Sequence, residues 1–378
     1  MRRIRAAFKP AAGSRRIIAH GHSRNPMSPA RWIGWIVVVG AIVAGVLVIR
    51  PCRPHEGPTS PPSGALGDAV PSVGRTPTVA EPGDAGGPIP TRIITIAPNS
   101  AEILCAVGAG DAIVGVDRFC VFPPELASRP RVGGLFDPDL ERITTLRPDL
   151  VVLRGRSDDV EHLCRRLGVR VYHDPTERLA DIPRCTRELG RITGREEAAA
   201  EVEQRFHERI ASIRRRVAAV LSSRPRPRVL MTLARDPAEL EDVFTAGPGT
   251  YVDELIDLAG GRNLYGDTDM AYPTVSMESV LTGRPDVIIE LMPEVHLTDA
   301  LRQQMLEQWR RVGPTPALAN GRIYFVGDEL NNALIPSPRY PDVIEAIAKL
   351  LHPDWDSVDV NEDEAAEPGP SESSVAGG

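Results

Sequence analysis

The chain has 378 residues with 44 Lys or Arg, 51 Asp or Glu and a formal net charge of −7, which leaves room for two compact domains and terminal segments. The charge is unevenly distributed, because residues 1–31 contain eight Lys or Arg and no acid, whereas residues 354–378 contain eight acids and no base. Since neither half of the central region is strongly basic, the composition argues against nucleic-acid binding.

An apolar segment follows the basic amino terminus. Residues 32–49, WIGWIVVVGAIVAGVLVI, contain no charged side chain, and this length is just sufficient to cross a bilayer. The preceding positive charges predict that residues 1–31 stay in the cytoplasm and that the following part is exported. The alternative is a cleaved signal peptide, but no small-x-small cleavage site follows, and Cys52 lacks the small residues of a lipid-attachment site. We therefore predict an uncleaved signal anchor, with a single pass through the inner membrane.

Two segments lack the large apolar side chains that a folded core needs. Residues 51–90 contain ten Pro and seven Gly, so we predict a flexible linker over residues 50–91. The acidic residues 354–378 are predicted to be disordered for the same reason. The folded part is therefore expected to span residues 92–353, outside the cytoplasm.

Strands and helices alternate in the first predicted lobe, residues 92–194. We predict strands at 92–97, 113–116, 150–153 and 169–172, and helices at 100–107, 140–146, 160–167 and 182–192. Ser100 is expected to cap the first of these helices. Such alternation indicates a parallel sheet that is covered by helices on both faces.

Residues 195–223 form the longest predicted helix. One apolar stripe recurs at steps of three and four residues: Ala198, Val202, Phe206, Ile210, Ile213, Val217 and Val220. Pro225 and Pro227 end the helix, because proline cannot continue its hydrogen bonds. A coiled-coil dimer is the alternative interpretation, but strand-like segments flank the stripe on both sides. We therefore predict a rigid bridge between two lobes.

The alternating pattern restarts in the second predicted lobe, residues 224–353. We predict strands at 228–233, 285–290 and 322–326, and helices at 251–259, 297–309 and 340–351. The predicted fold class is therefore α/β, with two three-layer α/β lobes joined by a single long rigid helix.

A short internal repeat relates the two lobes. Glu141 is followed after six residues by Arg-Pro-Asp and an aliphatic strand, and Glu278 is followed by the same tripeptide at the same offset. Self-similarity on both sides of the long helix indicates that the lobes are related units. One such acid alone would be explained as a solvated surface residue, but matching acids favour contact with a two-fold symmetric partner.

Four cysteines lie in the first lobe: Cys105, Cys120, Cys164 and Cys185. Export would permit disulfides, and four cysteines allow three pairings. Buried free thiols are the alternative, and the spacing does not match a metal site.

Several segments match a known family in their order and spacing. The first lobe contains RIITIAPNSAEILCAVGAGDAIVGVD, FPPE and LERITTLRPDLVVL, and the second contains GGRNLY, YPTVSMESVLTGRPDVIIEL and ALANGRIYFVG. Together they resemble the periplasmic binding proteins of ABC importers for vitamin B12, ferric siderophores and haem. The resemblance covers residues 92–353. It implies a ligand cleft between the lobes and delivery to a permease dimer with ATPase subunits.

The resemblance also implies which residues form the sites. In the family, loops at the carboxyl ends of the strands contact the ligand. Here those loops offer Pro98, Asn99, Arg118, Phe119, Leu135, Phe136, Arg154, Phe244, Tyr272, Asp328, Asn331 and Asn332. The alternative is that Phe136 and Phe244 are core residues and that the two arginines are surface charges. By the same resemblance, Glu141 and Glu278 pair with arginines on the two permease subunits.

The resemblance leaves the ligand open between a ferric siderophore and cobalamin, with haem as an alternative. Cobalamin binders of the family line the cleft with Trp and Tyr, whereas Leu135 and Arg154 stand here where aromatics are common. Only Phe119 and Tyr272 keep the aromatic character, and arginines suit an anionic ferric chelate. A bare metal ion is not expected as ligand, since the histidines are scattered along the chain.

Two other classes of protein compete with a transport role. An enzyme is not expected, because the sequence contains no phosphate loop, no Gly-x-Ser-x-Gly elbow and no His-Glu-x-x-His. We expect no cofactor beyond the transported ligand. The other class is a membrane-tethered structural or adaptor protein without a small ligand, which would also explain the anchor and the tails. A tethered haem-binding or ligand-sensing protein on the same fold is a further alternative.

Overall fold

The computed structural model describes residues 87–358, except residues 236, 293–294 and 328–334. The predicted segments 1–31 and 32–49, and Asp328, Asn331 and Asn332, therefore lie outside the described residues, as do most of the linker 50–91 and of the tail 354–378. Within the described part, no helix is both long and apolar enough to cross a membrane.

The amino-terminal lobe is built around a four-stranded parallel sheet in the order β2-β1-β3-β4. Its strands are β1 (Ile93–Ile96), β2 (Ile113–Val116), β3 (Leu150–Arg154) and β4 (Arg170–Asp174). Its helices are α3 (Pro98–Ala106), α4 (Leu140–Leu146), α5 (Asp158–Leu167) and α6 (Asp181–Thr193), with short 3-10 turns η1 (Gly110–Ala112) and η2 (Pro124–Leu126).

Both faces of this sheet are covered, which explains why β1 is buried along its whole length. Ile93 packs into a cluster with residues of α3 and α6, whereas Ile94 and Ile96 pack against α4 and α5. The prediction of a three-layer parallel lobe is therefore confirmed.

The carboxyl-terminal lobe contains a six-stranded sheet in the order β10-β9-β5-β6-β8, with β7 paired to β5. Its strands are β5 (Arg228–Ala234), β6 (Asp242–Thr245), β7 (Arg262–Asn263), β8 (Thr274–Ser276), β9 (Val287–Leu291) and β10 (Ile323–Val326). Its helices are α8 (Tyr251–Leu258), α9 (Met277–Gly283), α10 (Asp299–Val312), α11 (Pro316–Ala319) and α12 (Tyr340–Leu351), followed by η4 (Trp355–Ser357).

This second sheet is mixed and differs from the parallel pattern expected by analogy with the first lobe. Strand β6 runs antiparallel to both β5 and β8. Strand β6 has only four residues and β8 only three. They are extended because β6 pairs with β5 and β8 pairs with β6. A short segment of this kind has no periodicity of its own, so the sequence pattern missed it.

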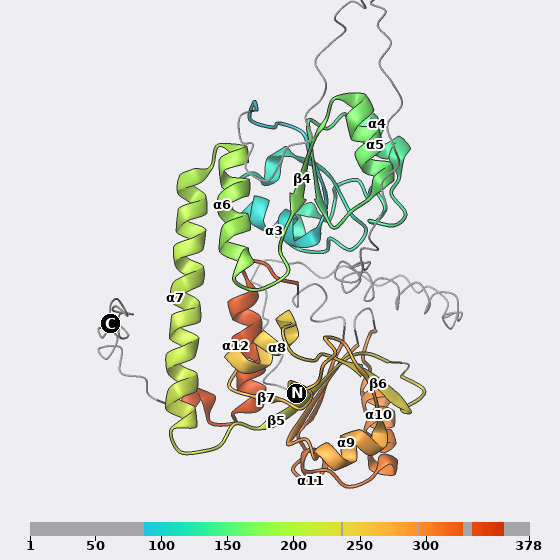
Figure 1. Cartoon of the computed structure of the whole chain (residues 1–378), viewed down its shortest axis with the longest axis vertical. Helices are drawn as coiled ribbons and strands as arrows, with labels where there is room; N and C mark the ends of the chain where they lie inside the picture. Colours follow the sequence, from blue (N-terminus) through green and yellow to red (C-terminus); the bar gives the residue numbers. More distant parts are fainter. Residues whose placement is uncertain (1–86, 236, 293–294, 328–334, 359–378) are drawn as a thin grey trace, which may run out of the picture.

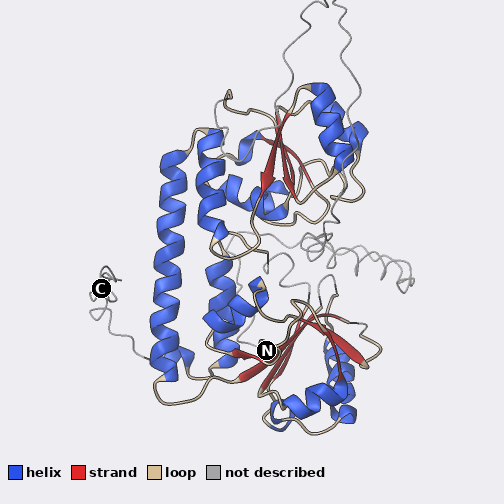
Figure 2. Ribbon diagram, in the orientation of Figure 1, coloured by secondary structure: helices blue, strands red, loops and turns tan. Residues whose placement is uncertain are grey.

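The bridge between the lobes is α7 (Glu196–Leu221), a helix of 26 residues and therefore ~39 Å long. Ala199 and Val202 pack into the core of the amino-terminal lobe. Phe206, Ile213 and Val217 pack into the core of the carboxyl-terminal lobe. Figures 1 and 2 show the helix running alongside both lobes. The predicted single connecting helix is confirmed, and its apolar stripe belongs to both cores.

Two local expectations have clear outcomes. The predicted cap at Ser100 is wrong, because α3 begins two residues earlier at Pro98, with Ala97 as its N-cap. Proline suits the first helical position, where no backbone N–H is needed.

The four cysteines of this lobe are free thiols, and three of them are buried. The structure therefore agrees with the alternative of free thiols and shows no disulfide among these four cysteines.

Candidate functional site

The two lobes contact each other through elements near the carboxyl ends of their strands. Arg339, at the amino-terminal end of α12, forms an ion pair with Glu102 of α3, with 2.7 Å between Nε and Oε2. The backbone N–H of Leu179 donates to Oε2 of Glu254 in α8 at 3.0 Å. Figure 1 shows the amino-terminal end of α12 directed toward the amino-terminal lobe. The lobes therefore meet where α3 approaches α12 and where the segment before α6 approaches α8.

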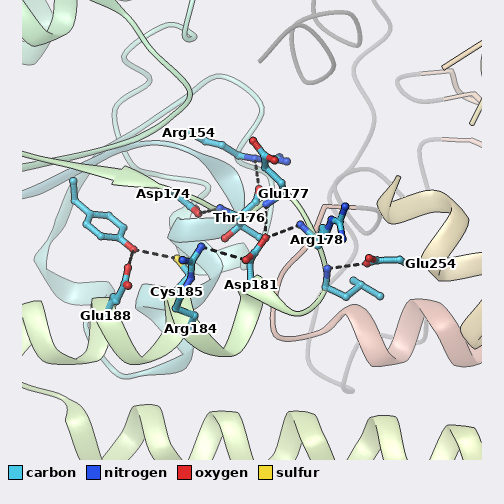
Figure 3. A network of polar contacts seen from close by, with 12 residues as sticks. Arg154, Asp174, Thr176, Glu177, Arg178, Asp181, Arg184, Cys185, Glu188 and Glu254 are labelled. Atoms are coloured by element: carbon cyan, nitrogen blue, oxygen red, sulfur yellow. Dashed lines mark hydrogen bonds and ion pairs between the residues drawn. The ribbon is translucent and has the colours of Figure 1, made fainter. Parts of the chain in front are cut away.

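A connecting segment between β4 and α6 fixes Arg154 at this region (Figure 3). Arg154 Nε donates to the carbonyl oxygen of Thr176 at 3.1 Å. The Thr176 N–H in turn donates to Oδ1 of Asp174 at 2.8 Å. Because the same segment continues to Leu179 and its bond with Glu254, the Arg154 guanidinium is held beside the other lobe.

The first predicted site segment, Pro98 and Asn99, opens α3. Asn99 is fully buried, and its Nδ2 donates to Oδ2 of Asp174 at 2.6 Å. The Ser100 hydroxyl donates to the same carboxylate oxygen. These bonds tie the start of α3 to the end of β4 through Asn99 Nδ2, whereas the buried Oδ1 of Asn99 has no hydrogen-bond partner among the described residues and Pro98 is half-buried.

Arg118 and Phe119 lie in the loop that follows β2. The Arg118 guanidinium lies 5.7 Å from the centre of the Phe119 ring and forms an ion pair with Asp137. The Arg118–Asp137 ion pair is accessible to solvent, since both side chains are exposed. The loop is pinned at its start by Asp117, whose Oδ1 accepts the Phe119 N–H at 2.7 Å.

Asp117 itself is almost completely buried. Burial raises its pKa to about 7, although the backbone N–H groups of Phe119 and Cys120 and the charge of Arg131 act in the opposite direction. The loop that presents Arg118 and Phe119 therefore rests on a carboxyl group that titrates near neutral pH.

Leu135 and Phe136 lie on the next loop of the same lobe. Leu135 is half-buried and lies against Gly155, the residue after Arg154. Phe136 is 59% exposed, so it is not a core residue. A large exposed apolar side chain is available for contact with a ligand or a partner.

Phe244 and Tyr272 come together in the carboxyl-terminal lobe. Their rings are stacked, with centroids 6.0 Å apart and an interplanar angle of 22°. Burial raises the pKa of Tyr272, and the positive charge of Arg154 from the other lobe works against this rise. Phe244 and Tyr272 therefore form a stacked, partly buried pair that packs against the core of the carboxyl-terminal lobe, and the charge of Arg154 acts on Tyr272.

Tyr251 is a candidate that the sequence analysis missed. It is the first residue of α8 and half-buried, and the charge of Arg154 acts on its hydroxyl group as well. Its sequence position suggested only a helix start after Gly-Pro-Gly-Thr. Thr250 does cap the helix by accepting the Asp253 N–H at 3.1 Å, and this cap is the signal that sets Tyr251 at the first position of the helix.

Glu141 and Glu278 occupy equivalent positions on a second candidate surface. Each is the second residue of a seven-residue helix, α4 or α9, and each is exposed. Both helices are capped by side chains, Asp139 accepting from the Arg142 N–H and Ser276 accepting from the Ser279 N–H. Figure 1 shows α4 and α9 at opposite ends of the molecule.

Among the described residues, no group of three His, Cys, Asp or Glu side chains could hold a metal ion.

Comparison with known proteins agrees with this architecture. A family model described as periplasmic binding protein matches residues 93–330. A vitamin B12-binding protein of Vibrio cholerae is 28% identical over 262 residues, which cover 69% of this chain and 88% of that protein. A cobalamin-binding protein of Halobacterium salinarum is 30% identical over 270 residues, which cover 70% of each chain.

Comparison with solved structures also finds periplasmic binding proteins. A periplasmic haem-binding protein from Pseudomonas aeruginosa is similar with a TM-score of 0.61 and 25% identity, covering 70% of this chain and 94% of that one. The periplasmic vitamin B12-binding protein of Vibrio cholerae is similar with a TM-score of 0.56 and 26% identity, covering 69% and 96%.

Proposed function

The chain belongs to the periplasmic binding protein family, and on that premise we propose that it is the substrate-binding component of an ABC importer for cobalamin or a related corrinoid. The ligand binds between the lobes and is delivered to a dimeric permease. The similar proteins named above bind vitamin B12, cobalamin or haem. They are binding proteins, which supports a role in transport over a role in catalysis.

The observation that carries the ligand proposal is the stacked pair of Phe244 and Tyr272, with the charge of Arg154 from the other lobe acting on Tyr272. Stacked aromatic side chains supply flat apolar faces for a large ring system. An arginine supplies a planar donor group for amide or phosphate oxygens at the edge of such a ligand. A ferric siderophore and haem are the competing ligands, because the same arginine would suit a carboxylate or an anionic chelate.

Binding of cyanocobalamin to the purified full chain in detergent tests the ligand class. We expect a dissociation constant of about 1 µM or tighter, as is typical of a ligand enclosed between two lobes. A ferric hydroxamate siderophore and haemin serve as competitors in the same titration. Tighter binding of either competitor would replace the corrinoid in this proposal, and binding of none would remove its basis.

We further propose that residues 32–49 anchor the protein in the inner membrane, with the two lobes in the periplasm. The basic residues before this segment and the Pro- and Gly-rich stretch after it support this topology. Protease added to spheroplasts should digest the lobes and leave the amino-terminal segment protected. Release of the lobes as a soluble protein with a new amino terminus would instead indicate a cleaved signal peptide.

A further inference from the structure

The Glu102–Arg339 ion pair joins residues of different lobes that are 237 positions apart in the chain. It is bidentate, with Arg339 Nε 2.7 Å from Oε2 and Arg339 Nη2 2.8 Å from Oε1. The Glu102 side chain is 3% exposed and that of Arg339 is 22% exposed. A bidentate arginine–carboxylate pair fixes the relative orientation of its two groups as well as their distance.

A buried ion pair needs an explanation beyond stability. Removing two charges from water carries a large free-energy cost, and apolar replacements of such pairs are often equally stable. We therefore expect this pair to favour one relative orientation of the two lobes, and not to add much to the free energy of unfolding. Besides the bridging helix, Leu179 and Ile182 of the amino-terminal lobe pack into the core cluster of the carboxyl-terminal lobe, and the ion pair adds a directional contact to this apolar packing.

The pair also contacts a loop that carries predicted ligand contacts. The Arg339 guanidinium lies 4.0 Å from the centre of the Phe122 ring. Phe122 belongs to the same loop as Arg118 and Phe119, and Arg131 anchors that loop by donating to the carbonyl oxygens of Asp117 and Cys120. A movement of Arg339 would therefore directly change the packing of this loop.

We propose that Glu102 and Arg339 form an inter-lobe latch that holds the two lobes, and with them the loop around Phe122, in the orientation that retains the ligand. Both are positioning residues, and neither is assigned a contact with the ligand. The Leu179–Glu254 bond is a second, weaker tie between the lobes. The latch rests on the proposed function only for its effect on ligand release.

The test removes both charges together, because a single substitution would leave an unpaired buried charge. The variant is Glu102→Gln with Arg339→Met in the full chain. A control variant, Arg228→Met with Asp286→Asn, removes another arginine–carboxylate pair that lies within one lobe. Should the first variant not fold, Arg339→Lys keeps the positive charge but loses the bidentate geometry and is measured in the same way.

Two measurements decide the proposal. Spin labels at exposed positions of the two lobes, Arg166→Cys and Gln303→Cys, report the inter-lobe distance by pulsed electron spin resonance. Cys52 and Cys105 are changed to serine in this background, so that only the introduced thiols react. The dissociation rate of cyanocobalamin is measured by its visible absorbance after dilution.

We expect the latch variant to broaden the distance distribution and to release cyanocobalamin roughly tenfold faster, since a lost buried pair acts mainly on dissociation. The control variant should change neither quantity. A distance distribution identical to that of the unmodified chain overturns the latch, whatever the dissociation rate. If the unmodified chain binds no cyanocobalamin, the proposed ligand fails, while the distance measurement still decides the latch.

Discussion

Arg147 and Arg284 adopt the same left-handed backbone conformation, with φ and ψ of 46° and 61° at the first residue and 50° and 64° at the second. Within the described part of the chain, no other non-glycine residue has a positive φ. Each arginine ends a short helix and precedes Pro-Asp at the start of a strand. The internal repeat is therefore also a repeat of backbone geometry, and it places Glu141 and Glu278 equivalently.

The aspartate of each repeat closes the turn in the same way. Asp149 accepts the backbone N–H groups of Thr91 and Arg92, and Asp286 accepts that of Arg228. The side chains of Arg92 and Arg228 donate to carbonyl oxygens at the ends of α4 and α9. Each short helix is thus attached rigidly to the first strand of its lobe.

Replacing Arg147 or Arg284 by glycine should leave the free energy of unfolding within about 1 kcal/mol of its present value or raise it. Glycine avoids the left-handed penalty of about 1–2 kcal/mol, although it adds entropy to the unfolded chain. Valine at either position should destabilise the protein by more than about 1 kcal/mol, because a β-branched residue tolerates this conformation poorly.

Urea denaturation measures these differences, with Arg165→Gly as the control. Arg165 lies in the helix α5, where glycine should cost about 1 kcal/mol. An equal loss for glycine at Arg147 and at Arg165 would show that the left-handed turn carries no strain.

Charge reversal at Glu141 or Glu278 should impair corrinoid uptake by cells and leave ligand affinity unchanged. A single exposed contact contributes little, so we expect a loss of several-fold for one change. Both acids belong to one chain whose lobes are joined by α7, so the second contact forms at high effective concentration, and the double variant Glu141→Arg with Glu278→Arg should lose uptake roughly tenfold or more.

The matched control for this experiment is Glu208→Arg, which reverses an exposed acid on α7. Its uptake should equal that of the unmodified chain. Normal uptake by the double variant would identify the two acids as solvated surface residues without a docking role.

Arg154→Met should weaken cyanocobalamin binding roughly tenfold, because it removes a planar charged donor from a partly buried position. Tyr272→Ala should weaken it by a similar factor through loss of the aromatic face beside Phe244. Arg156→Met is the control, since the Arg156 side chain is 81% exposed. Isothermal titration calorimetry separates these cases, and equal affinities for Arg154→Met and Arg156→Met would place the ligand elsewhere.

Asp117 should make stability depend on pH. Burial raises its pKa from 3.8 to about 7 in the folded protein, so the folded state keeps a proton that the unfolded state releases. Its contribution to stability is therefore full below pH of about 4 and is lost as the pH rises through about 7. Between pH 5 and pH 8, the free energy of unfolding of Asp117→Asn should rise by about 3 kcal/mol relative to that of the unmodified chain. Urea denaturation at both pH values measures this gain, and a constant difference would contradict it.

The order of the strands and α-helices in the amino-terminal lobe, the bridging helix and the repeat of Glu141 and Glu278 could all be predicted from the sequence. Each depends on local information, namely hydrophobic period, turn residues and proline positions within short windows. The helix prediction of 195–223 differs from the observed Glu196–Leu221 only at its ends, because a continuous apolar stripe is visible without knowing what covers it.

Only the tertiary structure decided how the lobes meet and what the polar residues there do. Asn99 and Ser100 bind Asp174, more than seventy positions away, and Glu102 binds Arg339 across 237 positions. The short antiparallel strands β6 and β8 likewise exist through pairing partners. No local pattern specifies such contacts. A polar side chain in a loop can cap a helix, join the two lobes or bind a ligand, and which of these it does depends on the group that folding brings beside it.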